Sequence, residues 1–191
     1  MNLRKSRALA VVGGVSLLAA CGEVENLRAT LPTATDAYTV FALSGTPASY
    51  PSGINTFVRQ AVRVDGNANF DIAFDIDAQG RVVIFPVQRI VSTVAADRRV
   101  GLRKVDGSAT VTSAPTGVYA DSSVVAAKGE VVVVEARRNG LGDACQFDIS
   151  PNIYTRLLIT DVVVATRTIL VQAVLNPNCG FRSFEDGIPA R

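Results

Sequence analysis

Residues 69–77 (NFDIAFDID) alternate between apolar and polar side chains, and this alternation constrains the fold more than any other feature of the chain. Successive side chains of a strand point to opposite faces, so large apolar residues share one face and aspartates share the other. The apolar face holds Phe70, Ile72, Phe74 and Ile76, and the polar face holds Asp71, Asp75 and Asp77 with Ala73. Turn-forming residues 77–80 (DAQG) and a β-rich run, 81–87 (RVVIFPV), follow. The segment predicts a hairpin with one face in the core, whose second strand ends or lies at an edge near Pro86, which has no amide donor.

Short β-like segments separated by turns fill most of the remaining chain. Residues 153–164 and 168–175 predict a second hairpin, and the valine run in 130–136 is typical of a strand covered on both faces. Shorter candidate strands are 38–43, 100–105, 109–112 and 123–126, with turns at Asp106-Gly107, Lys128-Gly129 and Asn139-Gly140. No fixed repeat and no alternation of strands with long helices is present. We therefore expect an all-β fold: an antiparallel β-sandwich, Ig-like in general architecture, with a small β-barrel as the alternative.

One segment departs from the β pattern. In residues 53–62 (GINTFVRQAV) the apolar positions follow a helical stripe, and Ser52 could cap a helix that starts there. A single short helix is the expectation, with a strand left open.

The first 20 residues have the pattern of an export signal. Residues 1–7 carry three positive charges, and residues 8–20 are small and apolar. Thirteen such residues are too few to cross a hydrocarbon core of about 30 Å, which needs about 20, so a signal peptide is expected rather than a permanent helix.

Leu18-Ala19-Ala20-Cys21, at the end of this segment, resembles the lipobox of bacterial lipoproteins. The resemblance implies that the Cys21 thiol accepts diacylglycerol, that cleavage precedes Cys21, and that the new amino terminus is acylated, with palmitate as a typical chain. Gly22 stands where an aspartate would favour the inner membrane, so outer-membrane attachment in the cell envelope is implied, with either face of that membrane open. The resemblance covers residues 1–22 and no family is recognised for the rest.

Length and charge then bound the mature chain. We expect a signal peptide at 1–20, a lipidated N-terminus and flexible tether at 21–36, and a single β domain at 37–191. Three of the 19 basic residues lie in the signal peptide, which leaves 16 basic against 17 acidic residues. A near-neutral domain lacks the positive footprint that nucleic acid requires, so no nucleic-acid partner is expected.

Cys145 and Cys179 are the other two of the three cysteines. A disulfide between them is expected in an oxidising compartment. A zinc site is the alternative, but zinc needs four ligands, and a chain without histidine leaves two of them missing.

The absence of histidine also removes the usual acid–base and nucleophilic sites, and no GxSxG, GxxxxGK[ST] or GxGxxG motif is present. We therefore expect no enzyme and no cofactor. Asp71, Asp75 and Asp77 are weak candidates for a calcium site or for the carboxylate pair of a glycoside hydrolase. A solvated strand face explains them more simply.

Two surface features remain as candidates for binding. Basic residues cluster at 98–104 and at Arg137 and Arg138, where anionic polysaccharide or lipid phosphate could bind, although such arginines are ordinarily solvated or paired. Phe181, Arg182 and Phe184 could form a partner surface beside Cys179, or the two phenylalanines could close the core.

The expected function is a lipid-anchored envelope protein with a non-catalytic binding or structural role, with another envelope protein as the expected partner. A calcium- or glycan-binding module is the alternative, although glycan binding is weakened by the absence of tryptophan. A carboxylate-dependent glycoside hydrolase ranks third. Whether a small molecule binds is left open by the sequence.

Overall fold

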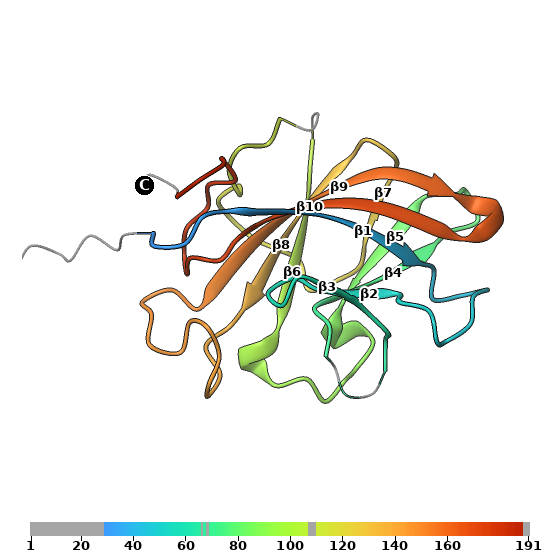
Figure 1. Cartoon of the computed structure of the whole chain (residues 1–191). Coiled ribbons are helices and arrows are strands. Elements are labelled where there is room, and N and C mark those ends of the chain that lie inside the picture. Colours follow the sequence, from blue (N-terminus) through green and yellow to red (C-terminus); the bar gives the residue numbers. More distant parts are fainter. Residues whose placement is uncertain (1–28, 66, 68, 107–109, 189–191) are drawn as a thin grey trace, which may run out of the picture.

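The computed structural model describes residues 29–65, 67, 69–106 and 110–188. The predicted signal peptide and Cys21 lie outside these residues. The described residues form two five-stranded antiparallel sheets that pack face to face and do not close into a barrel (Figure 1). The predicted β-sandwich is therefore confirmed.

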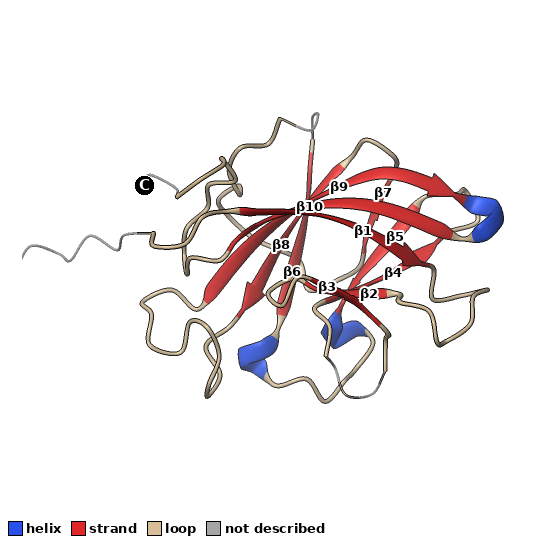
Figure 2. Ribbon diagram, viewed as in Figure 1, coloured by secondary structure: helices blue, strands red, loops and turns tan. Residues whose placement is uncertain are grey.

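The first sheet has the strand order β1-β10-β9-β8-β6, and the second has the order β3-β2-β4-β5-β7. The strands of the first sheet are β1 (Ala34–Phe41), β6 (Val100–Val105), β8 (Val131–Arg137), β9 (Asn152–Val163) and β10 (Thr168–Asn176). Those of the second are β2 (Gly53–Asn55), β3 (Gln60–Val62), β4 (Ile72–Ile76), β5 (Val82–Pro86) and β7 (Val124–Ala126). Helical structure in the described residues is confined to the short turns η1 (Val87–Arg89), η2 (Ala96–Arg98) and η3 (Val164–Thr166), as Figure 2 shows. None of these is long and apolar enough to cross a membrane.

Both predicted hairpins form. The β4–β5 hairpin closes through the amide of Asp77, which donates to the carbonyl of Arg81 at 2.9 Å, with Gly80 at φ 76°. β5 ends at Pro86, and its pairing with β7 stops at Ile84, so the missing amide of Pro86 costs that edge no hydrogen bond. The long β9–β10 hairpin turns through η3, with Arg167 in the left-handed region.

The valine run lies in β8, between β9 and β6, and is buried on both faces as predicted. Val132 and Val134 belong to the main core between the two sheets. Val131 and Val133 face the other way, into a second apolar cluster with Tyr154 and Phe184. The outer face of the first sheet is therefore covered by other parts of the chain around β8.

The short helix expected at 53–62 does not form. β2 and β3 make a hairpin instead, and β2 continues into the second sheet by pairing Ile54 with Ile72 of β4. Arg59 turns the chain at φ 62°, and the amide of Val58 donates to the side chain of Asn55 at 3.0 Å. β2 thus pairs with both β3 and β4, and Phe57 and Val58, which a helix would bury, are exposed in the turn between β2 and β3.

Two boundaries also differ from expectation. β1 begins at Ala34, so residues 34–36 pair with β10 and belong to the domain rather than to the tether. Residues 110–112 form no strand, and only a single bridge, between Ser113 and Ser183, follows them. The expected strands at 100–105 and 123–126 are present as β6 and β7.

Candidate functional site

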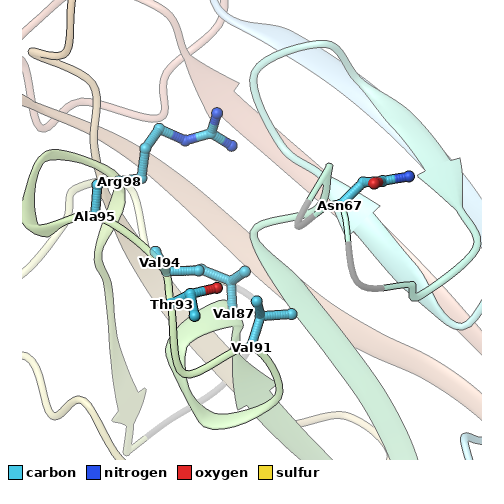
Figure 3. A pocket seen from close by; sticks show the side chains of 7 residues that line it. All are labelled: Asn67, Val87, Val91, Thr93, Val94, Ala95 and Arg98. Atoms are coloured by element: carbon cyan, nitrogen blue, oxygen red, sulfur yellow. The ribbon is translucent and has the colours of Figure 1, made fainter.

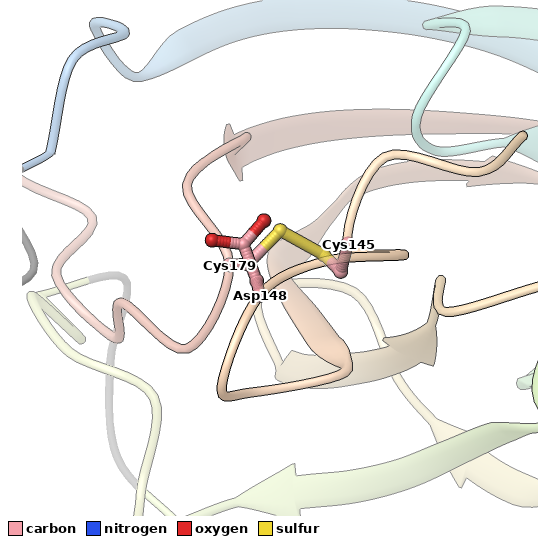
Figure 4. Close-up of side chains that lie close together, drawn as sticks. All are labelled: Cys145, Asp148 and Cys179. Carbon is pink, nitrogen blue, oxygen red and sulfur yellow. A yellow bond between two sulfur atoms is a disulfide. The ribbon is translucent and has the colours of Figure 1, made fainter.

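The predicted disulfide is present at one end of the sandwich (Figure 4). Cys145 lies in the segment 138–151, which connects β8 to β9 and is called the 138–151 loop below, and Cys179 follows β10. Asp148 lies beside the two sulfur atoms, and its carboxylate and both sulfurs fall within 4.8 Å of one another. Because both sulfurs are bonded to each other, neither is a thiolate, the form that binds zinc.

A buried ion pair ties the same loop to the second sheet. Arg138 donates through Nη2 to Oδ1 of Asp71, and the two side chains are 4% and 2% exposed. The other oxygen, Oδ2, accepts hydrogen bonds from the amide and the hydroxyl of Thr56, both at 2.7 Å. The guanidinium also lies 5.7 Å from the centre of the Phe57 ring. Both charges are thus used inside the protein, so the expected solvated position is wrong for Asp71, and Arg138 is not available to an external anion.

The other two candidate aspartates have arginines of their own. Asp75 accepts from Arg167 Nη2 at 2.7 Å and from the Ser44 hydroxyl at 2.8 Å. Burial raises the pKa of this carboxyl. These hydrogen bonds and one from the Ile76 amide together lower the pKa by more than burial raises it, so the pKa lies below its ordinary value. Asp77 pairs with Arg81, whose backbone amide is the main cause that lowers the pKa of Asp77. The three carboxylates therefore serve three separate ion pairs and do not converge on one point.

The candidate partner residues near the C-terminus turn mostly inward. Phe184 is buried in the second apolar cluster, in agreement with the expectation that it closes the core. Arg182 donates to the carbonyl of Pro115 at 2.6 Å and to the Tyr154 hydroxyl at 2.9 Å, and its guanidinium lies 4.6 Å from the centre of the Tyr154 ring. Phe181 is partly exposed and lines a hollow that is described below. This segment closes the outer face of the first sheet, and its role in partner binding stays a prediction.

Sequence reasoning missed three strongly exposed apolar side chains that lie in one loop. Leu141, Phe147 and Ile149 are 95%, 92% and 81% exposed, and all three belong to the 138–151 loop. The available signal was three large apolar residues within nine positions of a turn-rich segment, LGDACQFDI, that follows neither period of a strand nor that of a helix. Residues that follow neither period do not gather on one face of a strand or helix that could pack into the core.

The N-terminal end of the described chain lies next to this loop. The amides of Thr30 and Leu31 donate to Oδ1 of Asn178 at 2.9 and 3.0 Å, and Nδ2 of Asn178 donates back to the Leu31 carbonyl at 2.8 Å. A hollow of about 210 Å³ separates the two segments. Its lining includes Thr30, Leu31, Ala144, Asp148, Pro177, Asn178, Cys179 and Phe181. Residues 30–31 and the 138–151 loop therefore lie side by side at this end of the domain.

A second hollow, of about 240 Å³, lies where β5 leads into η1 and η2. Figure 3 shows its lining, with Asn67 on one side and the remaining residues on the other: Val87, Val91, Thr93, Val94, Ala95 and Arg98. The lining combines apolar side chains with the polar groups of Asn67, Thr93 and Arg98. Arg98 supplies the single charge of this lining, and its Nε is buried without a hydrogen-bond partner among the described residues. No acid–base pair is present among these lining residues.

Comparisons with protein-family models, with curated protein sequences and with solved structures found no match to this chain.

Proposed function

We propose that this protein is a lipid-anchored component of the cell envelope, held at the outer membrane by acyl chains on Cys21, with a non-catalytic binding role. The disulfide between Cys145 and Cys179 carries the proposal, because it uses the other two of the three cysteines and leaves Cys21 as the single thiol. That thiol stands in the lipobox-like sequence, where lipidation requires one. A disulfide also fits an exported protein, since reducing compartments rarely preserve one.

Support for binding rather than catalysis comes from how the charged candidates are used. Asp71, Asp75 and Asp77 are each engaged by an arginine of the protein itself. The 138–151 loop, by contrast, presents apolar side chains on a segment fixed by a disulfide. Apolar groups held in place ahead of contact favour association, because less conformational freedom is lost on binding.

The anchor is tested with Cys21→Ser. We expect the wild-type precursor to be cleaved ahead of Cys21, to take up a clickable palmitate analogue and to gain the mass of acyl chains on its first peptide. The Cys21→Ser precursor should remain uncleaved and unlabelled. The matched control is the Cys145→Ser/Cys179→Ser variant, which should still be acylated; normal processing of Cys21→Ser would overturn the anchor.

The binding role is tested by chemical crosslinking of intact envelopes followed by mass spectrometry. A specific protein adduct is expected with the wild-type chain and should be lost from Cys21→Ser, which lacks the anchor. Crosslinking that yields no reproducible protein adduct would argue against a protein partner.

A further inference from the structure

We infer that the 138–151 loop rests on the lipid bilayer to which the chain is tethered, with Leu141, Phe147 and Ile149 in the boundary between headgroups and acyl chains. The inference rests on the proposed function, because Cys21 supplies the tether to that bilayer. It adds a second, non-covalent contact that fixes how the domain sits on the membrane.

The exposure of these three side chains is the first argument. Single exposed apolar residues are normal in soluble proteins, but three large ones within nine residues of one loop indicate a contact surface. Phenylalanine, leucine and isoleucine are the residue types that enter the membrane interface when a protein lies on it.

The loop is also held in a fixed shape. The amide of Arg138 donates to the carbonyl of Pro151 at 2.7 Å, which closes the base of the loop. The carbonyl of Arg138 accepts from the amide of Cys145 at 2.7 Å, and the disulfide pins Cys145 to Cys179. The buried pair with Asp71 anchors Arg138 itself. A loop fixed in this way loses little freedom when its tip enters lipid.

The position of the tether gives the reason to choose lipid over a protein partner. Thr30 is already held by Asn178, beside the disulfide, and only nine residue steps separate it from Cys21. A chain that short reaches at most about 30 Å. The turn η3, at the other end of the twelve-residue strand β9, lies about 40 Å from the loop end of the strand. The tether therefore holds the loop end of the sandwich within about 30 Å of the bilayer, whereas the η3 end can lie farther away.

Charge indicates how the loop meets the bilayer. The loop contains Asp143 and Asp148, and Asp148 is exposed beside the disulfide. Carboxylates gain nothing from anionic headgroups, so apolar burial drives the contact, and the loop lies shallowly with the aspartates in the headgroup layer. Anionic lipid should therefore not be required.

The absence of tryptophan from the chain makes a direct test available. Phe147→Trp places a single reporter in the loop, and Val164→Trp places one at an exposed position of η3, at the opposite end of the sandwich. Both variants are prepared as full-length, processed lipoproteins and reconstituted into phosphatidylcholine vesicles, with and without brominated acyl chains. We expect the Trp emission of Phe147→Trp to shift to the blue and to be quenched by brominated lipid, and that of Val164→Trp to show neither change.

The mass of the N-terminal peptide, measured on the same samples, separates the two proposals. Acylated protein whose Phe147→Trp emission is unshifted and unquenched would overturn the lipid contact and leave the anchor intact. Absence of acyl mass would overturn the anchor and the lipid contact together. Quenching that appears only after phosphatidylglycerol is added would overturn an apolar contact. A photo-crosslinker at position 147 that captures protein rather than lipid in intact envelopes would assign the loop to a protein partner instead.

Discussion

Arg138, which directly follows β8 of the first sheet, forms a buried ion pair with Asp71, which directly precedes β4 of the second sheet. The pair crosses the interface between the sheets at the loop end of the sandwich. Thr56 donates two hydrogen bonds to the other carboxylate oxygen of Asp71, so the β2–β3 turn takes part in the same contact. One arginine thus positions the base of the 138–151 loop against both sheets.

Removing one partner of this pair should destabilise the fold strongly. Asp71→Asn leaves the Arg138 charge buried without its counter-ion, and breaking such a pair costs about 3–5 kcal/mol. Urea denaturation measures the change in the free energy of unfolding. The matched control is Asp36→Asn, which breaks the more exposed pair with Arg59 and should cost about 0–1 kcal/mol. Equal losses in the two variants would contradict the assigned role of Asp71.

A double replacement sharpens that test. Asp71→Leu combined with Arg138→Met removes both charges, and apolar residues of similar volume often match or exceed the stability of a buried pair. We expect the double variant to be more stable than either single replacement, measured under the same urea conditions. Strictly additive losses would show that the two side chains act independently.

The disulfide should contribute substantially to stability. Its two cysteines are 34 positions apart, and closing a loop of that length in the unfolded chain stabilises the folded state by about 3–4 kcal/mol. Cys145→Ser/Cys179→Ser should lose about that much in urea denaturation. Dithiothreitol should destabilise the wild-type domain by a similar amount and leave the double variant unchanged; an effect of the reductant on the double variant would point to another cause.

Stability should fall in acid partly through Asp75. The folded state lowers the pKa of this carboxyl, so the folded protein binds fewer protons there than the unfolded chain, whose aspartates titrate near 3.9. The stabilisation from Asp75 is therefore complete above about pH 5, and it is lost as the pH falls through the folded pKa of this carboxyl. Asp75→Asn should lower stability at pH 7 and flatten the decline below pH 4, measured by urea denaturation at several pH values.

The parts of the fold that could be predicted are those whose neighbours are close in sequence. Alternation and turn residues identified the β4–β5 and β9–β10 hairpins, because each strand pairs with the next one along the chain. Residues 53–62 were misassigned although β2 pairs with the next strand, β3, because strands of three residues are too short to show an alternation and their apolar positions also fit a helical stripe.

The candidate site divides in the same way. Cys145 and Cys179 could be paired from counting alone, because only two cysteines remain after the signal segment. Asp71 was expected in solvent because its polar position in the alternation is that of an exposed face. Its partner, Arg138, lies 67 positions away in the sequence, so the local alternation of side chains gives no information about this pair. The exposed loop residues were missed because they follow no period at all.

Phe147 and Phe184, which follow the two disulfide cysteines in the sequence, separate a surface role from a packing role. Phe184 is buried against Val131, Val133 and Tyr154, and truncating a buried phenylalanine costs about 3–5 kcal/mol through lost burial and the cavity left behind. Phe184→Ala should therefore lower the free energy of unfolding by about that amount. Phe147 is almost fully exposed, so Phe147→Ala should change it by no more than about 0.5 kcal/mol. Urea denaturation of the two variants in parallel makes the comparison. If Phe184→Ala were as stable as the wild-type protein, then this side chain would not close the outer face of the first sheet, and the C-terminal segment would be free to serve as the partner surface that its sequence first indicated.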